Sequence, residues 1–226
     1  MHDHVFSLGF SDSSFGDAPS LIGDQKILEL LGYLFSKYPN TIDFDDLPIP
    51  FRCVSADAVT GERIVHESGS LVSAIRSSIS IPLVFSPYPY QENRLVVDGG
   101  VVDNLPIALA RSLGADIVIA SDVNAMQLQT YEQLESLSAM AMQTVILVTQ
   151  EKAAVQHQLA DLLIFPDLRD INALDFTNTD LIIERGRLAV QEKKDELSAL
   201  ARRIGETRTL SVLDSNRDGA YDLLSV

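Results

Sequence analysis

Apolar residues recur along this chain with two periods, one typical of helices and the other of strands. Helical spacing begins at Asp24 and continues until Pro39, which ends the helix. Further helices are predicted at 71–77, over the stripe from Leu105 to Ser112, from Tyr131 to about Leu159, and from Thr177 to about Ala201. Short apolar runs predict strands at 50–56, 63–66, 88–90, 94–97, 117–120 and 162–165.

The order of these elements predicts the fold class. The run at 117–120 is continuously apolar, as expected of a strand that is buried on both faces. In the helix that starts at Tyr131, Val145 and Val155 belong to the predicted inward face, together with Leu134, Leu137, Ala141 and Val148. Strands that alternate with helices favour an α/β sandwich with a largely parallel sheet.

Composition limits the classes of function. A chain of 226 residues with 46% hydrophobic and 22% charged residues is long enough for one globular core. The net charge of −15 argues against a nucleic-acid partner and against electrostatic docking on anionic lipid, while apolar contact with a membrane stays open. The single cysteine, Cys53, excludes an internal disulfide, and we expect it to be buried.

Neither a signal peptide nor a membrane span is visible in the sequence. The first residues, Met1–Val5, contain no basic or apolar region of a leader. No stretch reaches the roughly 18 consecutive apolar residues that a transmembrane helix needs. The location is unknown, and these observations favour a cytoplasmic one.

The segment Leu95–Pro106 carries the most informative motif. An apolar run ends at Asp98, the pair Gly99-Gly100 follows, and a helix is predicted a few residues later. Asp-Gly is a strong hairpin signal, so a turn is one interpretation of Asp98. The other is an active-site carboxylate at the carboxyl end of a buried strand, with glycines that allow a sharp turn and leave room for a substrate. Asp103 and Asn104 precede the predicted helix and are expected to be N-cap residues.

Together with its surroundings, this motif resembles the Asp-Gly-Gly/Ala motif of patatin-like acyl hydrolases. The resemblance extends from about residue 20 to about 202 and rests on four further segments in the family's order, Asp45–Arg52, Ala74–Pro82, Leu113–Ala120 and Ala160–Asp167. It implies a three-layer α/β sandwich with a mostly parallel central sheet over residues 1–203. Residues 204–226 are predicted to be a tail outside the domain.

The resemblance also implies a chemistry, of which only half is visible. Patatin-like enzymes hydrolyse acyl esters of lipids and phospholipids through a Ser-Asp dyad, without metal or cofactor, and the match makes Asp98 the catalytic aspartate. The family's glycine-rich oxyanion loop and its Gly-x-Ser-x-Gly elbow do not occur in the chain. The nearest string, Gly9 to Ser13, lacks the second glycine, so Ser11 is a poor candidate nucleophile.

We therefore expect the domain to be incomplete at its N-terminus and inactive alone. The expected partners are an acyl lipid or ester substrate, the missing N-terminal portion of the domain and, transiently, a membrane. Ser77, Ser78 and Pro82 are predicted to line the pocket, because this stretch lies near the dyad in the family. The alternative is a non-catalytic lipid- or partner-binding protein of the same lineage.

Two other features suggest metal binding only weakly. His2 and His4 are close enough in sequence to bind a metal together, but a flexible terminus is the favoured interpretation. Asp214–Asp222 copies the first nine positions of a calcium-binding EF-hand loop, yet position twelve is Ser225 instead of glutamate. We expect a turn-rich tail and no metal site.

Overall fold

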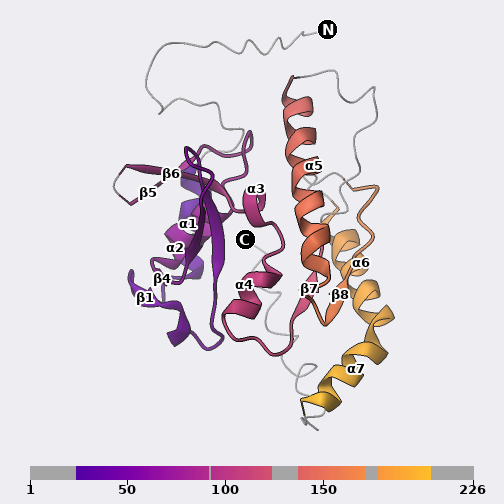
Figure 1. The fold of residues 1–226 in the computed structure, drawn as a ribbon. Helices are drawn as coiled ribbons and strands as arrows, with labels where there is room; N and C mark the ends of the chain where they lie inside the picture. The colour runs from indigo at the N-terminus through magenta and orange to yellow at the C-terminus, as the bar shows by residue number, and fades with distance from the viewer. Residues whose placement is uncertain (1–23, 92, 124–136, 172–177, 205–226) are drawn as a thin grey trace. The chain divides into compact units, whose positions relative to one another are not determined.

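The fold is taken from a computed structural model that describes residues 24–91, 93–123, 137–171 and 178–204 (Figure 1). The histidines of the first residues, the candidate Ser11 and the calcium-like tail all lie outside these residues. The chain divides into two compact units. Unit 1 comprises Met1–Ala108 and Leu128–Gln158, and unit 2 comprises Leu109–Gln127 and Leu159–Val226.

The helices of unit 1 pack around a small aromatic and aliphatic core. Phe44, Leu71 and Ala74 form its buried centre, because Phe44 is completely enclosed and the other two come from the apolar face of a helix. That helix starts after Ser70, whose hydroxyl accepts the N–H of Ser73 at 3.3 Å as an N-cap. The elements of this region are α1 (Asp24–Leu34), β1 (Ile42–Asp43), η1 (Phe44–Asp46), β4 (Ser68–Gly69) and α2 (Leu71–Ser78). Both predicted helices are present, but α1 ends at Leu34, before Pro39.

A four-stranded sheet forms the other half of unit 1. Its order is β3-β2-β6-β5, and every neighbouring pair is antiparallel. The strands are β2 (Cys53–Asp57), β3 (Arg63–His66), β5 (Tyr88–Tyr90) and β6 (Arg94–Asp98). The turn between β2 and β3 contains Gly61 at a φ of +71°, which a glycine adopts without strain. The predicted strands and the 63–66 hairpin are confirmed.

The relative direction of the strands differs from the expectation. Among the described residues, the parallel pairing is between β7 (Ile119–Ser121) and β8 (Leu162–Ile164), while the larger sheet is antiparallel. An α/β composition is confirmed, but a mostly parallel central sheet is not shown. Loop length explains two of the three pairs, because a parallel pair needs a crossover of a dozen or more residues and the connections β2–β3 and β5–β6 are short turns. The connection from β2 to β6 is long, so loop length does not explain why that pair is antiparallel.

Two predictions about unit 2 are wrong, one about the burial of a strand and one about the length of a helix. The strand predicted to be buried on both faces exposes Ile119 by 48%, and Ser121 is also exposed. The long helix predicted to reach residue 201 is broken at Lys193. Its two parts are α6 (Thr179–Glu192) and α7 (Lys194–Arg203).

The helices α4 (Ile107–Ser112) and α5 (Leu137–His157) follow β6 in the chain. After α4, Gly114 takes a φ of +93°, which confirms its predicted position beyond a helix end. In α5, Val155 is 70% exposed, so its predicted inward position is wrong.

One short helix, α3 (Gly100–Asp103), packs against β2 through the residue that precedes it. A Cβ on Gly99 would lie 2.2 Å from the Val54 carbonyl oxygen and 2.5 Å from its carbon. These contacts are with backbone, which cannot move aside as a flexible side chain would. Only glycine lets the end of β6 lie this close to β2.

Gly99→Ala should therefore destabilise unit 1. We expect a loss of about 1–3 kcal/mol or more in the free energy of unfolding, because the added methyl group forces β2 and α3 apart. Urea unfolding followed by circular dichroism measures this loss. The matched control is Gly32→Ala in α1, where a Cβ meets nothing within 4 Å. That substitution should stabilise the chain by up to about 1 kcal/mol, so equal effects of the two would contradict the packing argument.

Candidate active site

Asp98 is the last residue of β6 and is fixed by backbone contacts on two sides. Its register partner in β2 is Ser55. Its own N–H donates to the carbonyl oxygen of Ser80 at 2.9 Å, in the turn that follows α2. The aspartate is thus held between a neighbouring strand and a loop, as a catalytic group must be if its geometry is to be reproducible.

The carboxylate of Asp98 is half-buried and has one backbone donor. Its Oδ1 accepts the N–H of Gly100 at 2.6 Å. Burial raises the pKa of Asp98 above its ordinary value, and the Gly100 hydrogen bond offsets part of that increase. A carboxylate with a raised pKa is a stronger base, so this side chain is suited to accept a proton from a hydroxyl group.

The second glycine of the motif makes room for the carboxylate itself. A Cβ on Gly100 would lie 2.9 Å from Oδ1 of Asp98 and 2.7 Å from Oδ1 of Asn104. The sequence suggested that both glycines leave space for a substrate. In the structure, the space beside Gly99 is filled by the β2 backbone, and the space beside Gly100 by these two side-chain oxygens.

Asp103 and Asn104 do not have the predicted N-cap role. Asp103 is the last residue of α3, and its N–H donates to Gly99 at 2.8 Å, while Asn104 follows as the C-cap residue. The buried carboxylate of Asp103 instead accepts a hydrogen bond from Nη1 of Arg63 at 2.6 Å. The prediction failed because the helix turn starts directly at Gly100.

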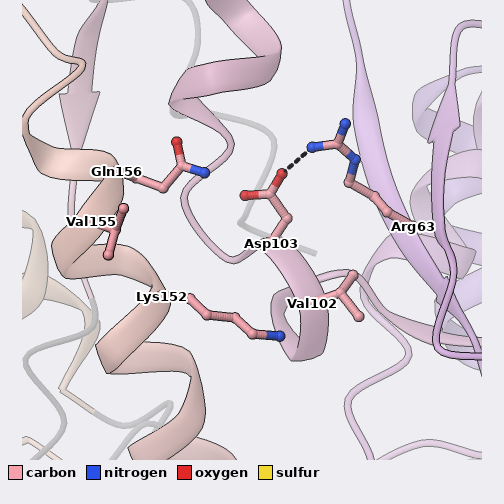
Figure 2. A pocket seen from close by; sticks show the side chains of 6 residues that line it. All are labelled: Arg63, Val102, Asp103, Lys152, Val155 and Gln156. Atoms are coloured by element: carbon pink, nitrogen blue, oxygen red, sulfur yellow. Dashed lines mark hydrogen bonds and ion pairs between the residues drawn. The ribbon is translucent and has the colours of Figure 1, made fainter.

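A cavity of about 460 Å³ lies beside α3 and α5, and Figure 2 shows the Arg63–Asp103 ion pair at its edge. Its lining residues are Arg63, Val102, Asp103, Lys152, Val155 and Gln156. Asp98 is not one of them. The cavity therefore adjoins the helix that follows the motif and does not contain the candidate base.

The serines predicted to line a pocket lie at the end of α2, just before the turn that accepts the Asp98 N–H, and they have local partners. Ser77 is completely buried, and its hydroxyl donates to the Ser73 carbonyl oxygen at 2.7 Å. Ser78 is hydrogen-bonded to the Cys53 thiol, whose pKa burial raises to about 12. Pro82 is partly buried. Their role in lining a substrate pocket stays a prediction.

Sequence reasoning missed a buried Ser–His pair in the same sheet. Ser55 Oγ and His66 Nε2 are 2.8 Å apart, and Ser55 is also the register partner of Asp98. Exposures of 0% and 2% prevent either side chain from meeting a substrate, and burial lowers the pKa of His66, which favours the neutral ring. The alternating pattern of the hairpin could have placed them on one face. Their burial argues that Ser55 is not the nucleophile.

The described residues contain neither a metal-binding cluster nor a helix that could span a membrane. In that part of the chain, no group of three or more His, Cys, Asp or Glu side chains is arranged to hold a metal ion. No helix within residues 24–91, 93–123, 137–171 and 178–204 is both long and apolar enough to cross a membrane.

The raised pKa of Asp98 predicts the effect of Asp98→Asn on stability. A carboxyl whose pKa is higher in the folded state binds protons more tightly when folded, so its charged form opposes folding as pH rises above the ordinary value of 3.8. We expect Asp98→Asn to raise the urea midpoint at neutral pH, and the difference from wild type should shrink towards about pH 3.

The matched control, Asp57→Asn, should change stability in the opposite direction. Backbone N–H groups of Thr60 and Val59 lower the pKa of Asp57, so its charge stabilises the folded state above its ordinary pKa. Its replacement should lower the urea midpoint at neutral pH, with the loss diminishing in acid. A loss of stability at neutral pH in both variants would contradict a raised pKa at Asp98.

The part of the chain that contains Asp98 matches a known protein family. Residues 7–111 match the family model described as patatin-like phospholipase. An uncharacterized NTE family protein of Mycobacterium tuberculosis is 39% identical over 83 residues, which is 37% of this chain and 23% of that protein. A patatin-like phospholipase domain-containing protein of Caenorhabditis elegans is 40% identical over 98 residues, covering 42% of this chain and 7% of that protein.

A longer match to a second mycobacterial protein has lower identity. Another uncharacterized NTE family protein of Mycobacterium tuberculosis is 29% identical over 181 residues, which is 68% of this chain and 30% of that protein. The chain thus spans less than a third of the length of these relatives. The segment matched by the family model contains α2, β6, the Asp98-Gly99-Gly100 motif and α3, and it is through this segment that the chain is similar to the patatin-like phospholipase family.

Proposed function

We propose that this chain carries the aspartate half of a Ser-Asp dyad that hydrolyses acyl esters of lipids. The observation that supports it best is the state of Asp98, a half-buried carboxylate with a raised pKa at the end of a strand inside the family match. Burial without a neutralising cation destabilises a carboxylate, and such an arrangement is typical of functional sites.

In the proposed reaction, Asp98 takes the proton of a serine hydroxyl while that oxygen attacks the ester carbonyl. The alcohol portion of the lipid leaves with a proton, and an acyl-serine remains. A water molecule then attacks the acyl-serine, and the free fatty acid is released. Asp98 needs a separation of about 2.6–3.2 Å from the hydroxyl for either proton transfer.

The aspartate is not expected to be effective by itself. Donors that stabilise the oxyanion contribute about 2.7–4 kcal/mol each, and general base catalysis about 10²–10⁴-fold in rate. The 226 residues contain no Gly-x-Ser-x-Gly string. We propose that a segment with this elbow and the glycine-rich loop completes the three-layer sandwich and extends its sheet with parallel strands.

The substrate class follows from family and charge. Acyl lipids are the substrates that the patatin-like family implies, and the chain's net charge of −15 disfavours anionic membrane surfaces. Transient contact with a neutral or zwitterionic lipid surface is compatible with an acyl-lipid substrate and with the negative net charge. Pocket lining by Ser77, Ser78 and Pro82 belongs to the same proposal.

Reconstitution tests this proposal. The chain is co-expressed with a segment that carries a glycine-rich loop and a Gly-x-Ser-x-Gly elbow, and release of nitrophenol from a short-chain nitrophenyl ester is measured. The chain alone should give no turnover above background. The reconstituted pair should turn over, and Asp98→Asn should reduce its rate by about 10²–10⁴-fold.

The control for this assay is Asp116→Asn, which changes an exposed carboxylate in unit 2 and should leave the rate unchanged. If Asp98→Asn retains the full rate in a reconstituted pair, the aspartate is not the base. If the chain alone turns over and Asp98→Ala abolishes this activity, the nucleophile lies within these residues and the half-dyad proposal is wrong.

A second candidate function is binding of lipid without catalysis. It is favoured by apolar side chains that unit 2 leaves exposed around its parallel strands. Ile119 in β7 is 48% exposed, Val123 after it 55%, and Phe165 directly after β8 50%. Exposed apolar groups of this size gather at surfaces that contact lipid or another protein.

Flotation with phosphatidylcholine vesicles tests lipid binding. If lipid binding is the function, the chain floats with the vesicles, and replacing Ile119 and Val123 with serine reduces the bound fraction severalfold, because the transfer of apolar area drives binding. Leu113→Ser, at a residue 51% exposed outside the two strands, should have little effect. Absence of flotation, or equal losses in both variants, would exclude these strands as the lipid-binding surface.

A further inference from the structure

We infer that Arg76 is a positioning residue for Asp98, and that it acts through the Ser80 turn without touching the carboxylate. This inference rests on the proposed function, since it concerns the placement of the proposed base. Arg76 lies in the last turn of α2, and Asp98 ends β6, so the connection joins two elements that are not neighbours in sequence.

Arg76 is the largest fully buried side chain in the described residues. Its guanidinium carbon lies 4.9 Å from the ring centre of Phe85 and 5.3 Å from that of Tyr88. Nη2 donates to Asp24 Oδ1 at 2.5 Å, and Asp24 is the acidic partner that offsets the buried charge. A cation held between two aromatic rings and a carboxylate has one geometry, so it can fix the position of whatever it binds next.

The next group is the hydroxyl of Ser80, which is also completely buried. Nη1 of Arg76 donates to Ser80 Oγ at 2.6 Å, and Ser80 Oγ donates in turn to the Arg76 carbonyl oxygen at 2.8 Å. This reciprocal pair closes the turn after α2. Because the turn is closed on both sides, Ser80 cannot shift without breaking a charge-assisted hydrogen bond.

The backbone of Ser80 then reaches the proposed base. Its carbonyl oxygen accepts the N–H of Asp98 at 2.9 Å. At this level of the sheet, β2 lies on one side of β6, and the Ser80 turn receives the Asp98 N–H. The position of Asp98 is therefore set by the sequence of contacts from Asp24 to Arg76, from Arg76 to Ser80 and from Ser80 to Asp98.

The charge of Arg76 does not cause the raised pKa of Asp98. The pKa of Asp98 is raised by burial, and the partial offset comes from the Gly100 N–H. Arg76 is neutralised by Asp24, on the other side of the Ser80 contact. Its influence on the carboxylate is geometric, since it keeps the end of β6 in a place where the carboxylate is half-buried.

Two native-state measurements on the isotope-labelled full chain test this inference. The first is hydrogen exchange of the Asp98 amide, compared with the Ala58 amide, which donates to Leu95 at 2.8 Å at the other end of the β2–β6 pair. Arg76→Met should speed exchange at Asp98 at least tenfold more than at Ala58. The second is the carboxyl carbon shift of Asp98 against pH, in which the same variant should move the pKa of Asp98 down towards its ordinary value.

Ser80→Ala provides a milder variant that decides the test if Arg76→Met does not fold. It removes only the hydroxyl, so it should produce the same two changes with smaller size. Arg76→Lys should not give the wild-type values, because one ammonium group cannot replace the two guanidinium nitrogens that bind Ser80 and Asp24. Arg94→Met is the matched control. It removes a partly exposed arginine from β6 itself, which is paired with the buried Asp57 and the exposed Glu62. Hydrogen exchange and pKa of Asp98 should stay unchanged in this variant.

Unchanged exchange and unchanged pKa at Asp98 in a folded Ser80→Ala or Arg76→Met chain would overturn the inference. Equal acceleration at Asp98 and Ala58 would overturn it too, since that result describes general loosening of the sheet. These outcomes are independent of the esterase assay. If reconstitution gives no hydrolysis while the Asp98 amide responds to Arg76, the positioning stands and the proposed catalysis fails.

Discussion

The close approach of Gly99 to the Val54 backbone is the constraint on which the rest of unit 1 depends. At this point β6 ends, α3 begins and both lie against β2, at a spacing that leaves no volume for a side chain. Once Gly99 occupies that place, Asp98 must sit in register with Ser55 and Gly100 must point its N–H at the Asp98 carboxylate. The two glycines of the motif are thus required by packing before any chemistry is considered.

The same packing creates an unfavourable electrostatic situation for Asp98. Its carboxylate loses solvent and receives one backbone N–H in return, which does not compensate for the burial. Arg76, which is more deeply buried, is treated differently, because a carboxylate, two aromatic rings and a hydroxyl surround its charge. The fold thus pairs the charge of Arg76 with Asp24 and leaves the charge of Asp98 without full compensation for its burial.

Sequence patterns predicted the elements near the site better than their pairing. The spacing of apolar residues and the positions of proline and glycine located α1, α2, β3 and β6, because each of these elements depends on residues close in sequence. Strand direction depends on contacts across the fold, and the antiparallel partner of β6 was not visible in its own residues. The helix α3 was missed since Val101 and Val102 after two glycines favour an extended chain locally, and tertiary packing overrides that preference.

The contrast between Asp98 and the other shifted carboxylates argues for a functional reading of the motif. Within the described residues, hydrogen bonds or arginine partners lower the pKa of the aspartates at 45, 57, 161, 167 and 170. Those groups stabilise turns and ion pairs, so their charge favours the folded state. Asp98 alone among the shifted carboxylates of that part of the chain has a raised pKa, and a turn residue of the Asp-Gly type would have no reason to be buried in this way. A carboxylate whose charge opposes folding is the kind of group expected at a functional site, and this supports the proposal that Asp98 is the base.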